Sequence, residues 1–237
     1  MGSLPSHPEL LDWLAAEFRD GNQSFKDLHR LIVTSRAYRQ SSNARNERAE
    51  STDGNNRLLW RMNRRKLEAE NIRDAALHVS GRLNPAMFGP AFQDFVIEKP
   101  EHSPHYQYHL YDHDNPRSDR RSIYRFIVRS QHQPFMTALD CADPSIAVEK
   151  RTESLSALQA LALLNNGFMI SMSKSFAERL RRESDSAEGQ ITRAFELALS
   201  RAPTDSELTD LASYTREHGL PNTCRLIFNL NEFIFAD

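Results

Sequence analysis

The stretch RKLEAENIRDAALHVSG, residues 65–81, decides the fold because its apolar residues recur at the spacing of an α-helix. At about 100° per residue, five of them lie at Ile72 or within about 60° of it on a helical wheel. This places one apolar stripe on the helix, formed by Ala69, Ile72, Ala75, Ala76 and Val79. A glycine directly after the last periodic residue is a common helix end. The pattern therefore predicts a helix over about 64–80 that stops at Gly81.

Helical patterns continue on both sides of this stretch. Upstream, Ser6 to Glu9 has the S-x-x-E form of a capping box, and Ser24 can cap a second helix that runs to about Tyr38. Downstream of Pro144 the pattern is helical to the end, and residues 204–207 form a second S/T-x-x-E box. The last stretch, CRLIFNLNEFIFAD, is apolar nearly all round, which predicts a buried helix over about 223–235.

Residues 84–119 interrupt this pattern. They hold five of the eleven prolines and show no helical period, so they predict a long irregular excursion with at most short strands. The following RRSIYRFIVRS, residues 120–130, is ambiguous, since Ile123 and Ile127 suit a helix whereas Tyr124, Phe126 and Val128 suit a strand. We expect a mainly α protein with one helical domain over 1–237, in which strands are confined to 84–130. Its parts are N-terminal helices at 6–83, the insert at 84–119 and a C-terminal helical part at 120–237.

Composition excludes several classes of protein. The net charge of -2 gives no general attraction to nucleic acid or to an anionic membrane surface. No apolar run approaches the roughly 20 residues of a membrane span, and no secretory signal pattern opens the chain. The sequence contains no GxSxG, HExxH, P-loop or dinucleotide-binding motif. The two cysteines, Cys141 and Cys224, form no CxxCH haem attachment motif, and we expect two free buried thiols rather than a disulfide.

Two charged residues fall inside the apolar stripe of the predicted helix. Arg65 lies at about +20° and Glu68 at about -40° on the wheel, while Lys66, Glu70, Arg73 and Asp74 lie on the far side. We expect both side chains to be mostly buried and hydrogen-bonded. Because buried charges need partners, Arg65 should contact Glu68 or a carboxylate or carbonyl from residues 120–165. Two interpretations stay open: a structural ion pair that holds the helix to the C-terminal half, or a carboxylate placed in a cleft.

An arginine series and several polar side chains complete a candidate polar cluster. Arg121, Arg125 and Arg129 would line one face of a helix, in a run that begins with Arg117 and Arg120. They could bind an oxyanion, or they could pair internally with Asp140, Asp143 and Glu149. Residues 165–167, Asn-Asn-Gly, fit a helix break within an otherwise apolar segment. The candidate cluster consists of Arg65, Glu68, Arg121, Arg125, Asp140, Gln159 and Asn165.

The segment EHSPHYQYHLYDHD, residues 101–114, carries four histidines: His102, His105, His109 and His113. On a helix all four would share a face, as a metal site requires. Pro104 and the alternation of Tyr106, Tyr108 and Leu110 argue against a helix. On a strand His105, His109 and His113 would share a face. Successive residues on one face of a strand lie about 6.5–7 Å apart, so neighbours could share a metal only if the strand bends. We expect a solvated polar and aromatic loop without a catalytic metal, in which these three are the candidates for an opportunistic one.

Five stretches together resemble a known family. They are NRLLWRMNRRKLEAENIRDAALHVSGRLN (56–84), RRSIYRFIVRSQHQPFMTALDCADPS (120–145), ALQALALLNNGFM (157–169), LALSRAPTDSEL (197–208) and NLNEFIFAD (229–237). They resemble the planctomycete PSD domain, a domain of unknown function, over nearly the whole chain. Many relatives read T-x-T-P-L-Q-A-L where this chain has SLSALQAL at 154–161, so no role for a threonine hydroxyl carries over.

The resemblance implies a setting for the chain. The PSD domain typically forms the C-terminal part of large exported proteins that carry PSCyt modules, one of which is a c-type-cytochrome-like haem domain. It therefore implies a periplasmic or otherwise exported location and a haem, if any, in another domain.

Two function classes remain. The first is a binding or assembly module that supports a haem domain or holds a polysaccharide or partner protein. The second is part of a hydrolase or oxidoreductase acting on polysaccharide, with a site formed by Glu68, the arginine series and Asp140 and completed by a preceding domain. The absence of a catalytic motif favours the first class, and a deep pocket lined by those charged residues would favour the second.

Overall fold

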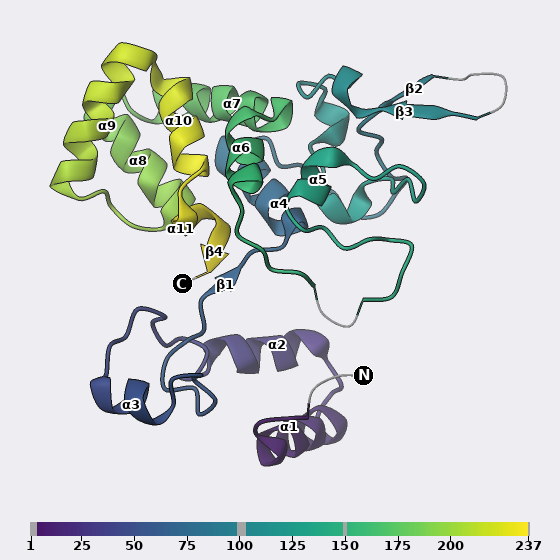
Figure 1. Ribbon diagram of the computed structural model, residues 1–237, viewed down its shortest axis with the longest axis vertical. Coiled ribbons are helices and arrows are strands. Elements are labelled where there is room, and N and C mark those ends of the chain that lie inside the picture. The colour runs from purple at the N-terminus through teal and green to yellow at the C-terminus, as the bar shows by residue number, and fades with distance from the viewer. Residues whose placement is uncertain (1–3, 99–102, 149–150, 237) are drawn as a thin grey trace. The chain divides into compact units, whose positions relative to one another are not determined.

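The computed structural model of the chain describes residues 4–98, 103–148 and 151–236 (Figure 1). These residues form eleven α-helices and four short strands, which confirms a mainly α protein. They divide into two compact units: unit 1 contains the residues up to Arg65 together with Ala236, and unit 2 contains Lys66–Phe235. This division falls before the predicted insert at 84–119. The expectation of one domain over 1–237 stays a prediction.

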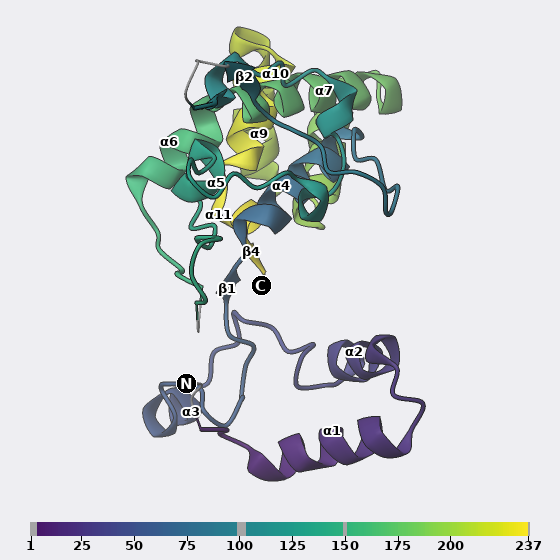
Figure 2. The same ribbon diagram turned by 90° about the vertical axis from the view of Figure 1, so that its right-hand side faces the viewer.

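Unit 1 contains the helices α1 (Pro8–Asp20), α2 (Phe25–Thr34) and α3 (Glu47–Thr52). Figure 2 shows α1 and α2 linked by a short turn, beside which the rings of Phe18 and Phe25 lie 5.0 Å apart. Ser24 caps α2 as predicted, because its side chain accepts a hydrogen bond from the Asp27 backbone N–H. The predicted capping box at Ser6 is wrong, since the Ser6 hydroxyl bonds the ring of His7 instead.

Unit 2 holds the hydrophobic core. The helices α4 (Ala69–Ser80) and α10 (Leu220–Phe228) both pack on α7 (Gly167–Glu183), and α8 (Ala187–Leu199) packs on α9 (Asp205–His218) (Figure 1). The predicted apolar stripe of α4 faces this core, and Ala69, Ile72 and Ala76 are fully buried. Phe176 of α7 and Phe228 of α10 pack at the centre with ring centroids 5.4 Å apart.

The start of α4 corrects the sequence analysis. The helix begins at Ala69 and not at Arg64, and Arg65–Lys66 forms the strand β1, which pairs with β4 (Phe235–Ala236). Side chains alternate along a strand, so Lys66 is buried and Arg65 is exposed. The predicted burial of Arg65 and Glu68 is therefore wrong: both are exposed, because they precede the helix, which begins at Ala69. The predicted confinement of strands to 84–130 is wrong for the same pair, β1 and β4.

The predicted irregular excursion is confirmed. It contains the strands β2 (Val96–Glu98) and β3 (His105–Gln107), which pair antiparallel, and the 3-10 turns η1 (Tyr108–Leu110) and η2 (Pro116–Ser118). The segment at 120–130 forms neither an α-helix nor a strand. It holds the short 3-10 helix η3 (Ser122–Tyr124) and two isolated β-bridges, at Arg120 and Arg125. Without an α-helix there, the predicted common face of Arg121, Arg125 and Arg129 does not form. The short helix α5 (Pro134–Ala138) follows.

The excursion and the residues that follow it cover the side chain of Arg73 on α4. That side chain was predicted on the far side of the helix, yet it is buried under the excursion. Its guanidinium donates to the carbonyls of Ser118 and Arg120 and lies 4.9 Å from the ring of Phe92. Burial lowers the pKa of Arg73 to about 10, although the nearby carboxylates of Asp94 and Asp74 act in the opposite direction. A cation on the outer face of α4 thus organises the loop that covers it.

The last apolar stretch of the chain is buried as predicted, but it does not form one continuous helix. The apolar stretch predicted as one helix forms two, α10 and α11 (Asn231–Ile234), and Ile227, Phe228 and Phe233 are buried as expected. The predicted break at 165–167 separates α6 (Ala157–Asn165) from α7, with the side chain of Asn166 capping α7. The second predicted capping box, at Thr204, is present. Among the described helices, none combines the length and apolar character that a membrane crossing requires.

Candidate functional site

Two of the predicted site residues, Asp140 and Gln159, meet around the buried Lys66. The ammonium of Lys66 donates to Asp140 Oδ2 at 2.8 Å, to the Ser154 carbonyl at 3.0 Å and to Gln159 Oε1 at 3.0 Å. Asp140 also accepts from the backbone N–H of Ser154 at 2.8 Å, from its hydroxyl and from Gln159 Nε2 at 2.9 Å. We name these four residues, Lys66, Asp140, Ser154 and Gln159, the Lys66 cluster.

The Lys66 cluster is closed on itself. An ammonium has three donors, and all three of Lys66 are used within the cluster. Its side chain is 4% exposed and that of Asp140 is 16% exposed. Burial raises the pKa of Asp140, but the hydrogen bonds from Lys66, Ser154 and Gln159 together hold it below its usual range. The cluster therefore holds a carboxylate and a cation that neutralise each other, and it ties β1 to the segment before α6.

A second group of charged residues borders the Lys66 cluster. Arg151 donates to both carboxylate oxygens of Glu70, at 2.9 and 2.7 Å, and its Nε lies 3.5 Å from Glu68. The Cys141 thiol contacts the same Glu70 at 3.7 Å. Burial and the Glu70 carboxylate raise the pKa of Cys141, which keeps it protonated and weakly nucleophilic. Cys141 and Cys224 are both free thiols, as expected, but only Cys224 is buried, whereas Cys141 is half-buried.

The other predicted polar residues do not join these clusters. Arg65 is exposed, and Arg121 lies 3.8 Å from Asp74. Asn165 accepts a hydrogen bond from Arg225 at the exposed end of α6. Arg125 is half-buried, and it lines a hollow of about 20 Å³ together with Cys141. That volume is room for about one water molecule and not for a substrate.

The histidines are dispersed. His105 lies in β3 and His109 in η1, whereas His113 is half-buried and packs its ring 6.2 Å from that of Phe168. Burial, aided by the Arg73 cation, lowers the pKa of His113. Within 4–98, 103–148 and 151–236, no three His, Cys, Asp or Glu side chains gather as metal ligands would. His102 lies outside the described residues.

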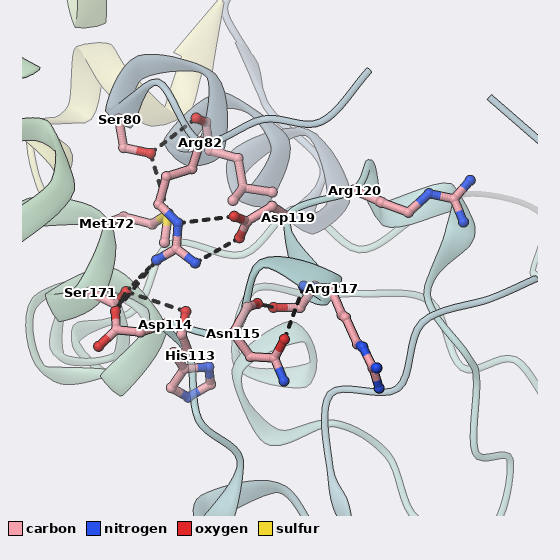
Figure 3. Close-up of polar contacts among 12 residues, drawn as sticks. Ser80, Arg82, His113, Asp114, Asn115, Arg117, Asp119, Arg120, Ser171 and Met172 are labelled. Carbon is pink, nitrogen blue, oxygen red and sulfur yellow. Dashed lines mark hydrogen bonds and ion pairs between the residues drawn. The ribbon is translucent and has the colours of Figure 1, made fainter. Parts of the chain in front are cut away.

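Arg82, just beyond α4, holds a third polar group (Figure 3). Its guanidinium donates to both oxygens of Asp119, at 3.1 and 2.8 Å, and to the Ser171 hydroxyl at 2.8 Å. Ser171 in turn donates to Asp114. Burial raises the pKa of Asp119, while Arg82 acts to lower it. No sequence pattern indicated this group, which joins the end of α4, the excursion and α7.

Unit 1 contains a cavity of a different kind. A hollow of about 520 Å³ opens between α1 and α2, and the chain at 59–65 completes its wall. We name it the unit 1 groove; its lining residues are Leu10, Trp13, Leu14, Leu31, Ile32, Ser35, Ala37, Tyr38, Leu59, Arg61, Met62, Asn63 and Arg65. A volume of this size falls within the range of ligand and peptide sites, and its walls are mostly apolar. No sequence motif marked it, although both helices carry apolar residues at helical spacing.

Comparison with known proteins gives a family and no function. The model of the family PSD1, described as "Protein of unknown function (DUF1553)", matches residues 1–215. Neither the curated proteins nor the solved structures contain a match to the chain.

Proposed function

Because the chain belongs to the PSD1 family of proteins of unknown function, we propose its role from its own surface: it is a binding and assembly module. The observation that supports this proposal is the apolar surface of unit 1. Within residues 4–65 no hydrophobic side chain is buried, and Trp13, for example, is 48% exposed. A unit that fully buries no apolar side chain gains little stability from its own fold, so a partner that covers the surface supplies the missing burial.

In this proposal the polar groups of unit 2 stabilise the fold and do not bind a ligand. The carboxylate of Asp140 is held by Lys66, Ser154 and Gln159, and that of Glu70 by Arg151. A general acid or base needs a proton-transfer path to a substrate, whereas these carboxylates accept hydrogen bonds from fixed side chains. We therefore assign the Lys66 cluster to holding the fold and the unit 1 groove to binding.

The proposal extends to a setting. Its support is the family resemblance, in which the PSD domain accompanies PSCyt modules in exported proteins. We propose that the module works outside the cytoplasm, next to a c-type haem domain of its parent protein. In that setting it holds another domain, a partner protein or a polysaccharide in place.

Site-specific photocrosslinking tests the binding role. A photoreactive phenylalanine analogue replaces Leu31 in the groove, and in a matched variant it replaces Arg36, which is exposed on the same unit but does not line the groove. In cells that produce the parent protein, we expect the Leu31 position to give crosslinked peptides from one defined segment outside residues 1–237. The same diffuse adducts at both positions, or adducts confined to residues 1–237, would contradict the proposal.

A further inference from the structure

The charged residues of the unit 1 groove are all of one sign. Its walls are formed by apolar side chains of α1 and α2, such as Leu14 and Ile32. Arg61 and Arg65 are the charged residues that line it, and no acidic side chain belongs to the lining. The groove therefore offers an apolar trough with two guanidinium groups, contributed by the chain segment that completes its wall.

These guanidinium groups are available to a ligand. Arg65 is exposed, and the described residues place no carboxylate within salt-bridge distance of it. The Arg61 side chain packs over the ring of Trp60, whose centroid lies 5.1 Å from Cζ, and no carboxylate of the described residues pairs with it. A guanidinium presents five donors in a planar fork, a geometry that matches a carboxylate.

The N-terminal part of the chain, which forms the groove, also carries a positive net charge. Residues 1–65 contain eleven Lys and Arg against eight Asp and Glu, a net charge of +3, while the whole chain has -2. The field around the groove therefore attracts an anionic partner, although the chain as a whole is acidic.

We propose that the unit 1 groove binds an amphipathic helix of a partner protein, with leucine-like anchors in the trough and carboxylates beside Arg61 and Arg65. This inference rests on the proposed binding function and names the chemistry of its partner. A helix fits because α1 and α2 already form two walls of helical side chains, so a third helix lays its apolar face between them. The anchors recur at i, i+3 or i+4, and i+7, which keeps them on one face.

Calorimetric titration of the chain with two synthetic helical peptides tests the inference. Both peptides carry the same leucine face, and one carries glutamates where the other carries lysines. We expect the glutamate peptide to bind at least about tenfold more tightly, because charge-assisted hydrogen bonds to two guanidinium groups are among the stronger ones. The double variant R61E and R65E should reverse this order, and the control Arg36→Glu should leave it unchanged.

The outcomes separate this inference from the function on which it rests. Equal affinity of the two peptides would overturn the acidic partner and leave a binding role intact. Binding of laurate with no binding of either peptide would replace the helix by a fatty acid. Self-association that R61E and R65E abolish, measured by light scattering, would make the occupant a second copy. If no probe binds and the Leu31 crosslinks match those at Arg36, both the inference and the proposed function fail.

Discussion

Replacing Lys66 by methionine tests the central role given to the Lys66 cluster. The change keeps most of the buried stem and removes the ammonium, with its hydrogen bonds to Asp140, Ser154 and Gln159. Removing one partner of a buried ion pair costs about 3–5 kcal/mol. Asp140 is 16% exposed and keeps three other donated hydrogen bonds, so we expect the lower end, about 3 kcal/mol. In a protein of this size that corresponds to a fall in Tm of about 6–12 °C.

The neighbouring residue supplies the control. Arg65→Met changes a charge on the same strand but on its exposed side, and we expect a change within about 0.5 kcal/mol. Urea unfolding, followed by circular dichroism at the helix band, measures the free energy of unfolding of both variants. The values are compared when the dependence of that free energy on urea concentration is unchanged. A double-mutant cycle with Asp140→Asn should give a coupling of about 1–3 kcal/mol. If Lys66→Met and Arg65→Met had the same effect, or if the coupling were absent, the structural role of the cluster would be refuted.

Three further predictions concern unit 2. Phe176→Ala should lower the free energy of unfolding by about 3–5 kcal/mol in urea titrations, because it empties the centre of the core. Cys224 is fully buried, whereas Cys141 is half-buried and weakly nucleophilic, so a thiol reagent should modify Cys141 slowly in the folded protein and Cys224 only on unfolding, as mass spectrometry would show. The hydrogen bonds from Arg201 hold the pKa of Glu207 at about 2, below its usual 4.5, so their stabilisation is complete above pH 4.5 and is lost as the pH falls towards 2. Since the pair is one-third exposed, Glu207→Gln should remove about 1 kcal/mol or less of acid-dependent stability in Tm measurements from pH 6 to pH 2.

The start of α4 shows where sequence periodicity stops being informative. The spacing of Ala69, Ile72 and Ala76 identified the core face, because a helix repeats every 3.6 residues whatever lies around it. The same wheel failed at Arg65, since β1 pairs with β4 at the opposite end of the chain. No pattern in the sequence around Arg65 predicts that pairing. Asp140 and Gln159 were nevertheless predicted as site residues, and they lie in one cluster whose cation is Lys66.

The excursion shows a second limit. Its lack of helical period was readable from its prolines, but the residues that order it lie elsewhere in the chain. Lys66, Arg73 and Arg82 each place a cation under or beside a loop, at the start, the middle and the end of the α4 region. Each of these cations accounts for carbonyls or carboxylates that would otherwise lack partners in irregular backbone. Hydrophobic packing therefore determines where α4 lies in unit 2, while Arg73 on α4 and the cations of Lys66 and Arg82 on either side of it hold the loops in place. Arg73, on the polar side of the helical wheel, is therefore informative about the fold because it holds the aperiodic segment that follows α4.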